Sequence, residues 1–403
     1  MKTLGSIVTY RKGKPPKTGP HGRLPVLSPH YLRTGEIEEM AEPTAKDVVL
    51  NGGELILLWD GSNAGEFFRA RAGVLSSTMV AFDFDEELTN RDYLYYDLKR
   101  FEPELKGRTA GSGIPHVDKE VLLSRSVFEG GPLEQAAAAK VLLKVDHAIE
   151  QTEALLAKQQ RIKTGLMHDL LTRGLDSQGQ LRDPLTHEFK SSGFGPIPDE
   201  WDVRELAACT KETITYGIVQ AGPHVQGGIP YIRTGDMSGD KLVRDQMLCT
   251  SPEIAARFKR SEVRAGEIVC AIRATIGKVL QVPPELDGAN LTQGTARISP
   301  AADVDAAFLL WALRSMNTQN ELQLQSKGTT FAEITLTDLR RAPVAIPRST
   351  DEQHRIGVIL NQHDVTVRAQ VAQLTKLRRL KSGLMHDLLT GDMSVTPLIP
   401  ATL

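Results

Sequence analysis

The chain has 403 residues, and this length predicts two or three domains, each with a hydrophobic core of its own. Hydrophobic residues make up 40% and charged residues 24%, and the net charge of −2 excludes a uniformly basic nucleic-acid-binding protein, so such a surface has to be local or completed by a partner chain. Residues 1–10 have no signal-peptide core and no apolar run approaches the roughly 18 residues of a membrane span, which indicates a cytoplasmic protein with no membrane contact.

The first element in chain order is a globular domain, residues 1–130. It consists of short β-rich runs that are separated by turn residues, such as 53–59 (GELILLW), followed by the polar turn 60–65 (DGSNAG). A long helix is predicted over 131–173, and a linker rich in Gly, Pro, Ser and charge over 174–200.

The second half of the chain follows the same order. Residues 201–348 form another β-rich domain, in which 266–273 (GEIVCAIR) precedes the turn 274–277 (ATIG). A second long helix is predicted over 349–392, and residues 393–403 are expected to be a disordered tail. Cys209, Cys249 and Cys270 are too few and too widely spaced for a disulfide framework or a zinc site, so they are interpreted as reduced packing residues.

An internal repeat relates the two helices. Residues 161–172 (RIKTGLMHDLLT) and 379–390 (RLKSGLMHDLLT) are identical at ten of twelve positions, with a constant offset of 218 residues. At the same offset, the pair 134–135 (EQ) matches 352–353 (EQ), and Asp146 matches Asp364. The chain is therefore two diverged copies of one unit, a plan that suits a target with approximate two-fold symmetry.

Both helices carry an apolar seam with alternating spacings of three and four. Polar residues interrupt the seams at matching places, Thr152 with Gln370 and Lys163 with Lys381, and such residues set register in coiled coils. The simplest way to bury both seams is to pair them with each other, and the alternative is that each helix packs on its own globular domain. We therefore predict an α+β protein with two globular α/β domains, each followed by a long helix, the two helices packed as an antiparallel coiled coil with pseudo-two-fold symmetry.

Several motifs together resemble the specificity subunit of type I DNA restriction-modification systems. They are GLMHDLLT in both helices (165–172 and 383–390), the Glu-Gln opening of each helix, and the segments 193–201 (GFGPIPDEW), 229–237 (IPYIRTGDM), 266–279 (GEIVCAIRATIGKV) and 59–65 (WDGSNAG). The resemblance spans nearly the whole chain. One departure is that IPDEW introduces the second domain, whereas the first begins almost directly at Leu4 and Gly5.

The resemblance implies a non-catalytic subunit. In this family two target-recognition domains each bind one half of a bipartite, asymmetric sequence in double-stranded DNA, and the paired helices set the spacer. The helices also dock two methyltransferase subunits, which use S-adenosylmethionine, and a restriction subunit that uses ATP and magnesium can join. This chain is expected to bind no cofactor or metal itself. Two modules on one stiff rod also turn a distance into a base-pair count.

Base contacts are expected from loop residues, since Arg and Lys suit guanine and Gln suits adenine. The candidates in the first domain are Lys12, His30, Tyr31, Arg33, Trp59, Asn63, Arg108, Ser112 and His116. Those in the second are Tyr216, Arg233, Arg273, Thr275, Gln293, Lys327, Thr329 and Thr330. Any one of them can instead be an ordinary solvated loop residue. Residues 111–117 (GSGIPHV) parallel 328–334 (GTTFAEI) at an offset of 217.

The repeated helix motif is the expected docking surface for partner subunits. Its residues are Gly165, Leu166, Met167, His168 and Asp169, with Gly383, Leu384, Met385, His386 and Asp387 in the second copy. Neighbours in a helix do not face each other, so His-Asp is not interpreted as a catalytic pair. The basic run 376–381 (KLRRLK) is either a solvated face or a contact to spacer phosphates or an acidic partner.

Two other functions stay open at this stage. One is a helical scaffold for partner subunits that no longer binds DNA. The other is a nuclease, because residues 102–106 (EPELK) faintly resemble a carboxylate-lysine cluster. The sequence contains neither an Asn/Asp-Pro-Pro-Tyr motif nor a GxxxxGK[ST] phosphate loop, which favours a binding protein over an enzyme.

Overall fold

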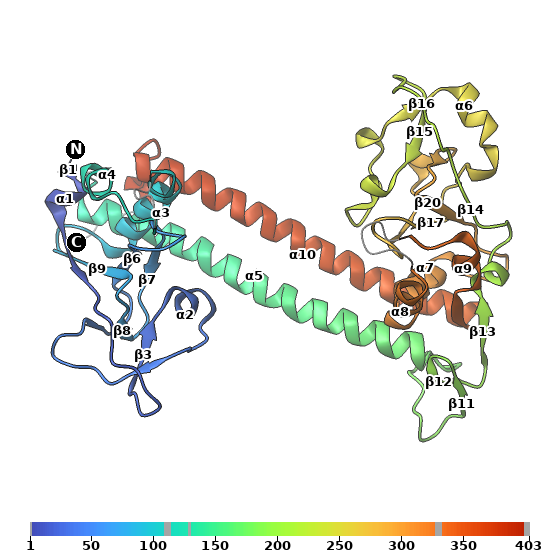
Figure 1. Ribbon diagram of the computed structural model, residues 1–403, viewed down its shortest axis with the longest axis horizontal. Helices are drawn as coiled ribbons and strands as arrows, with labels where there is room; N and C mark the ends of the chain where they lie inside the picture. The colour runs from blue at the N-terminus through green and yellow to red at the C-terminus, as the bar shows by residue number, and fades with distance from the viewer. Residues whose placement is uncertain (1, 109–113, 128–129, 327–332, 399–403) are drawn as a thin grey trace. The chain divides into compact units, whose positions relative to one another are not determined.

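The computed structural model describes residues 2–108, 114–127, 130–326 and 333–398. The chain folds into two compact units, of which unit 1 comprises Met1–Ala154 with Val371–Leu403, and unit 2 comprises Leu155–Gln370. Each unit contains one globular domain and one segment of each of two long helices, α5 (Pro132–Thr172) and α10 (Thr350–Thr390) (Figure 1).

The globular domain of unit 1 is built on an antiparallel sheet of order β2-β9-β6-β7. Its strands are β2 (Val8–Lys12), β9 (Met79–Phe84), β6 (Leu55–Leu58) and β7 (Phe67–Arg69). Successive side chains of a strand point to opposite faces. Leu55 and Leu57 therefore pack on helix α3 (Arg91–Gly107), while Ile56 and Leu58 enter a separate core with Leu27.

A second sheet of unit 1, of order β4-β3-β8-β5, supplies that separate core. Its strands are β4 (Met40–Ala41), β3 (Leu24–Leu27), β8 (Gly73–Leu75) and β5 (Val49–Leu50), with β3 and β8 parallel. The remaining elements are helices α1 (Leu4–Ile7), α2 (Pro29–Thr34) and α4 (Lys119–Ser124), and the short pair β1 (Lys2–Thr3) and β10 (Ser126–Val127).

Unit 2 repeats this topology. Its antiparallel sheet has the order β14-β20-β17-β18, with strands β14 (Thr215–Tyr216), β20 (Thr295–Ile298), β17 (Ile268–Ala271) and β18 (Val279–Gln281). The second sheet is β16 (Cys249–Thr250), β15 (Ile229–Ile232) and β19 (Asn290–Leu291), with β15 and β19 parallel. The edge pair is β13 (Trp201–Glu205) with β21 (Pro343–Pro347).

The helices of this domain are α6 (Pro252–Arg257), α7 (Ala306–Arg314), α8 (Met316–Leu324) and α9 (Leu336–Arg341). Short 3₁₀ helices are η1 (Leu206–Cys209), η2 (Thr234–Met237), η3 (Arg244–Gln246), η4 (Lys259–Ser261), η5 (Pro284–Leu286) and, in unit 1, η6 (Thr396–Leu398). The internal repeat therefore extends from the long helices to the strand order of both domains.

The Glu-Gln opening of each long helix has a defined structural role. The Gln135 side chain accepts a hydrogen bond from the Asn90 N–H and donates one to the Gly130 carbonyl. Gln353 likewise accepts from the Asp305 N–H and donates to the Pro347 carbonyl. Asn90 and Asp305 are the N-caps of α3 and α7, so each glutamine ties the start of a long helix to the start of a domain helix.

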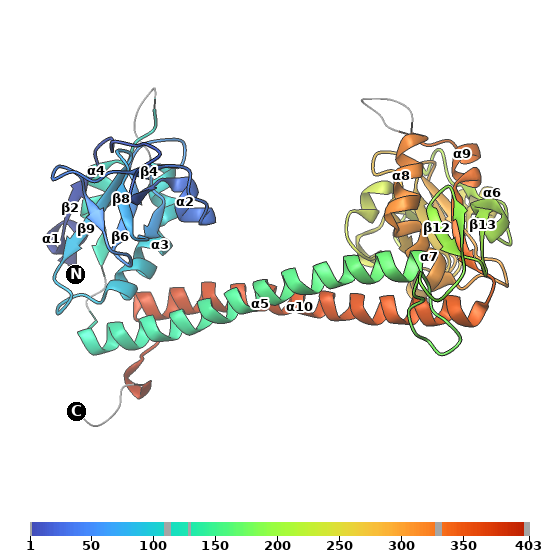
Figure 2. The same ribbon diagram turned by 90° about the horizontal axis from the view of Figure 1, so that it is seen from below.

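The two long helices lie side by side and antiparallel in each unit (Figures 1 and 2). In unit 1 the start of α5 packs on the end of α10, with Ala138 and Leu142 in one cluster with Leu388. In unit 2 the end of α5 packs on the start of α10, with Leu170 in one cluster with Leu360. The predicted antiparallel fold class is confirmed.

Matching ion pairs join the helices at the polar positions of the seam. Lys381 pairs with Asp146 at 2.6 Å in unit 1, and Lys163 pairs with Asp364 at 2.5 Å in unit 2. Each ammonium also lies over an aromatic ring, Lys381 over Tyr96 and Lys163 over Trp311. Because a shift along the helices would break both pairs, these residues define the register.

The structure differs from the sequence predictions in two segments. Residues 393–403 were predicted to be disordered, but the chain is placed as far as Leu398, because Val395 is buried in the cluster of Leu388 and Tyr93. The segment predicted as a linker, 174–200, contains the hairpin β11 (Phe189–Ser192) and β12 (Gly195–Pro198) and the buried side chains of Leu175 and Arg182. Residues 399–403 lie outside the described residues.

Candidate functional site

The turn after the central strand has the same backbone in both domains. In unit 1, the Trp59 N–H donates to the Thr78 carbonyl, and the Val117 N–H donates to the Trp59 carbonyl. In unit 2, the Ile272 N–H donates to Gly294 and the Ile334 N–H to Ile272. The next residues form equivalent β-bridges, Asp60 with His116 and Arg273 with Glu333. These hydrogen bonds align the two turns residue by residue.

The side chains at these equivalent positions carry opposite charge. Asp60 is anionic and accepts a hydrogen bond from the Lys12 ammonium at 2.8 Å, whereas Arg273 is cationic and donates to Glu333 at 3.0 Å. The ion pairs are partly exposed, and exposed pairs contribute only about 0–1 kcal/mol, so Lys12 and Arg273 can exchange these partners for a ligand at small cost. One scaffold thus presents two different chemistries.

The tip of each turn has a left-handed backbone. Gly61 has φ of 119°, and Ala274, at the equivalent position, has φ of 62° and is the one non-glycine residue with positive φ in the described part of the chain. A non-glycine residue in this region costs on the order of 1 kcal/mol and is retained where the surrounding structure holds it. The strain marks the turn next to Arg273 as a shaped loop.

Most candidates of the first domain lie on exposed or half-buried loops. Trp59 stacks on Tyr10 with ring centroids 5.2 Å apart, next to the Lys12, Asp60 and His116 group. Arg33 pairs with Glu66, and His30 lies 3.4 Å from Glu36, both on or beside α2. The structure therefore separates two groups, one at the turn after β6 and one at α2. Asn63 and Arg108 are exposed, and Ser112 lies outside the described residues.

The interpretation of Tyr31 as a base-contacting residue is wrong in this structure. Only 9% of Tyr31 is exposed, since α2 turns it into the core that contains Leu27 and Phe68. The Arg71 guanidinium covers its ring at 5.4 Å. Tyr31 is therefore a packing residue, and the neighbouring Arg33 is the exposed side chain of that helix.

In the second domain the structure brings Arg273, Thr275 and Gln293 to neighbouring turns. The Thr275 N–H donates to the Arg273 carbonyl, and the strand-to-strand turn that holds Gln293 also holds Gly294, whose carbonyl binds Ile272. Tyr216 lies exposed on β14. Arg233 forms two hydrogen bonds with Asp236, and this carboxylate raises the pKa of Arg233. Lys327, Thr329 and Thr330 lie outside the described residues.

Sequence reasoning missed some members of these groups. Tyr10 stacks on Trp59 and lies under the Lys119 ammonium, which is 5.8 Å from its ring. Tyr10 and Lys12 are two residues apart on one strand and so share a face, and this alternation is the signal that points to Tyr10. Asp60 and Glu333 carry no local signal, since their roles depend on pairing between distant segments.

The docking residues of the helix motif fall into three kinds. His168 and His386 are exposed, Asp169 and Asp387 are half-buried, and Leu166, Met167, Leu384 and Met385 pack against the cores of their units. A Cβ atom built on Gly165 or Gly383 would meet no described atom within 4 Å. No neighbour within the described structure therefore explains a glycine at these two positions.

The remaining candidates have structural roles. In the basic run 376–381, Arg378 pairs with Glu153 and Lys381 with Asp146, so part of the run joins the helices. Burial opposes ionisation of Glu102, but hydrogen bonds from Lys106 and Lys99 outweigh it and hold its pKa below the usual value. In the described ranges no group of three or more His, Cys, Asp or Glu suits a metal ion, and no helix there is long and apolar enough to cross a bilayer.

Comparison with known proteins gives a consistent result. The family model for the type I restriction modification DNA specificity domain matches residues 1–158 and 199–378. The type I restriction enzyme MjaVIII specificity subunit of Methanocaldococcus jannaschii is 29% identical over 98% of this chain and 93% of its own length. The EcoBI specificity subunit of Escherichia coli is 25% identical over 75% of this chain and 65% of its own length.

A solved structure shares the fold. The crystal structure of a type I restriction-modification S subunit from M. genitalium matches with a TM-score of 0.65 at 15% sequence identity. The match covers 96% of this chain and 95% of the solved chain. The shared architecture therefore extends over both domains and both long helices.

Proposed function

This chain belongs to the family of type I restriction-modification DNA specificity subunits, and we propose that its two globular domains bind the two different halves of one DNA sequence. As a specificity subunit it supplies sequence recognition rather than catalysis. The observation that carries the proposal is the equivalent turn with exchanged chemistry, Lys12 and Asp60 in one domain against Arg273 and Glu333 in the other. A shared backbone with different side chains suits an asymmetric bipartite target in double-stranded DNA.

The test is selection of bound duplexes from a randomised library at fixed salt. The protein is purified with its methyltransferase partner. Arg273→Ala should relax base preference in one half of the selected sequence only, because a lost bidentate contact costs about 1–3 kcal/mol at its own base pair. Lys12→Ala should affect the other half.

The matched control is Arg348→Ala, since Arg348 pairs with Asp202 on the edge strand and is similarly exposed. It should change neither half. Equal binding to all duplexes by the unmodified protein would reject DNA recognition and favour the scaffold alternative. Selectivity that is unchanged in both variants would remove Lys12 and Arg273 from the interface while leaving the family role in place.

The long helices are proposed to set the spacer between the two half-sequences. Both α5 and α10 contribute a segment to each unit, and the matching ion pairs at Lys381 and Lys163 hold their register. A change in helix length should therefore change the spacer and leave the half-sequences unaltered.

The helix motifs are proposed to dock two methyltransferase subunits. Glycine inside a helix is about 1 kcal/mol less favourable than alanine, so its occurrence at Gly165 and again at Gly383 favours close approach of another chain. The exposed residues Ile162 and Leu380 lie three positions earlier in each copy and extend this surface. Gly165→Ala with Gly383→Ala should stabilise the chain and weaken methyltransferase binding, and unchanged binding would contradict the proposal.

The chemistry of the assembled complex is proposed to reside in its other subunits. Methyltransferase subunits would hold S-adenosylmethionine, and a restriction subunit would use ATP and magnesium, while this chain binds none of them. Because the proposed ligand is duplex DNA, we infer a cytoplasmic location.

A further inference from the structure

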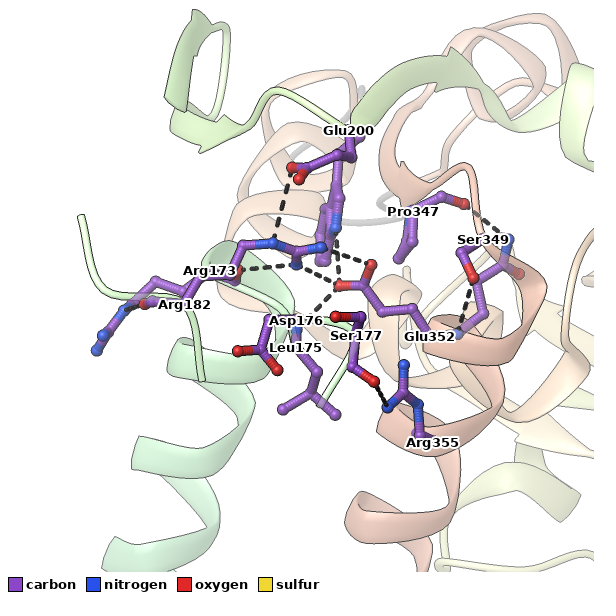
Figure 3. A network of polar contacts seen from close by, with 12 residues as sticks. Arg173, Leu175, Asp176, Ser177, Arg182, Glu200, Pro347, Ser349, Glu352 and Arg355 are labelled. Carbon is purple, nitrogen blue, oxygen red and sulfur yellow. Dashed lines mark hydrogen bonds and ion pairs between the residues drawn. The ribbon is translucent and has the colours of Figure 1, made fainter. Parts of the chain in front are cut away.

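A buried carboxylate organises the segment that leads into the second domain. Glu352, in the first turn of α10, accepts hydrogen bonds from Arg182 Nη1 at 2.6 Å and Nη2 at 3.1 Å (Figure 3). It also accepts from Trp201 Nε1 at 3.0 Å and from the Leu175 N–H at 2.9 Å. The Trp201 ring packs edge-on against Phe308. One carboxylate therefore gathers an arginine, an indole and a backbone amide.

Unit 1 contains the counterpart of this carboxylate. Glu134 lies in the first turn of α5, at the repeat offset from Glu352, and Tyr93 takes the place of Phe308. The second correspondence rests on hydrogen bonds, because the Tyr93 N–H binds the N-cap side chain of α3 just as the Phe308 N–H binds that of α7. Among the described residues Glu134 accepts one hydrogen bond, from the Gly131 N–H, and forms no ion pair.

The surroundings of Glu134 contain an unsatisfied polar atom. Tyr93 is 2% exposed, and its hydroxyl has no hydrogen-bond partner in the described structure. Burial raises the pKa of Tyr93, and the nearby carboxylates of Asp97 and Glu134 add to this effect. A buried hydroxyl without a partner costs about 1–3 kcal/mol, which a ligand that supplies a hydrogen bond would recover.

Two adjoining cavities lie at this place. The smaller, of about 110 Å³, is lined by Tyr93, Glu134, Gln135 and Gly130 together with residues near the end of α10. The larger, of about 540 Å³, shares Gly130 and Gln135 with it and extends to the first strand. Together they continue from the carboxylate of Glu134 along the edge of the domain.

The strand register explains why the chain itself does not fill these cavities as it does in unit 2. Leu4 and Leu206 are equivalent, since the Leu4 N–H binds the Arg125 carbonyl and the Leu206 N–H binds the Ala342 carbonyl. Trp201 precedes Leu206 by five residues, whereas the sequence contains three residues before Leu4. No residue of the sequence therefore corresponds to Trp201 in unit 1.

We propose that these two cavities form a docking site for a peptide segment of another protein that presents a tryptophan and an arginine. Its indole would pack on Tyr93, its guanidinium would pair with Glu134, and its backbone would continue the edge next to β10. Charge complementarity supports a cationic segment, and the Arg182, Trp201 and Glu352 group shows that this fold accommodates the combination. The proposal is independent of DNA recognition.

A labelled synthetic peptide with the sequence of residues 180–205, which includes Arg182 and Trp201, is a direct probe for the full chain. Fluorescence anisotropy should show saturable binding to the unmodified protein. Glu134→Gln should weaken it at least about tenfold, because a charge-assisted pair is lost. Peptides with Arg182→Ala or Trp201→Ala should weaken it similarly, and Tyr93→Phe tests the orphaned hydroxyl.

The matched control is Glu150→Gln, an exposed glutamate of the same helix, which should bind the peptide like the unmodified protein. Circular dichroism establishes that each variant is folded. Absence of binding, or equal binding to Glu134→Gln, would overturn the proposal. Binding that occurs only after residues 399–403 are deleted would also overturn it, since the chain's own terminus would then be the occupant. DNA half-site selectivity should be the same in Glu134→Gln, so failure here is distinct from failure of the proposed function.

Discussion

Replacing Asp146 by asparagine removes one charge from the helix register pair of unit 1. The Lys381 and Asp146 side chains are 29% and 20% exposed, so solvent screens their attraction less than in a surface pair. The Tyr96 hydroxyl donates to Asp146 at 2.6 Å, and an asparagine oxygen still accepts this bond. The loss is therefore mainly the ion pair, and we expect about 1–2 kcal/mol, between a surface pair and a buried charged hydrogen bond.

Calorimetric unfolding of the single and double variants of Asp146→Asn and Lys381→Gln measures the coupling energy of the pair. We expect about 1 kcal/mol or more, and a melting temperature lowered by roughly 3–6 °C in Asp146→Asn. The matched control is Arg378 with Glu153, which joins the same helices in the same unit but is 62% and 43% exposed. Its coupling should stay below about 0.5 kcal/mol.

Equal coupling energies for the two pairs would refute this reasoning, because burial would then make no difference. A value near zero for Lys381 with Asp146 would also exclude this pair as a determinant of register. Asp364→Asn in unit 2 should reproduce the effect of Asp146→Asn, and the two changes should add, since their hydrogen-bond partners are not shared.

Three further predictions concern the helices, the thiols and the pH dependence of stability. Inserting one heptad into each long helix adds about 10 Å and should lengthen the preferred DNA spacer by about three base pairs with unchanged half-sequences, and altered half-sequences would contradict the spacer role. Burial raises the pKa of Cys209 to about 11 and of Cys270 to about 12, so an aromatic disulfide reagent should modify Cys249 alone in the folded protein. Burial opposes ionisation of Glu267, but hydrogen bonds from Arg297 and Ser299 hold its pKa below 4.5, so its stabilising effect should be lost as the pH falls below that value, and Glu267→Gln should show a weaker acid dependence in denaturant titrations.

Local patterns in the sequence were sufficient for the framework. The repeat at residues 161–172 and 379–390 and the spacing of the seams predicted two units, two long helices and their antiparallel pairing, and the structure confirms this fold class. The polar positions Lys163 and Lys381 were predicted to set register, and their carboxylate partners prove to be the repeated residues Asp364 and Asp146. Helical periodicity is a short-range property, so it can be derived from sequence alone.

The composition of the candidate site depended on tertiary structure. Asp60 and Arg273 became equivalent only through hydrogen bonds to segments far along the chain, and Tyr31 entered the core because α2 packs on a second sheet. The sequence also did not reveal that Glu352 gathers Arg182 and Trp201, whereas Glu134 has no such partner among the described residues. These contacts join residues with no local pattern, and strand register and side-chain burial, which follow from packing of the whole domain, decide which of them meet.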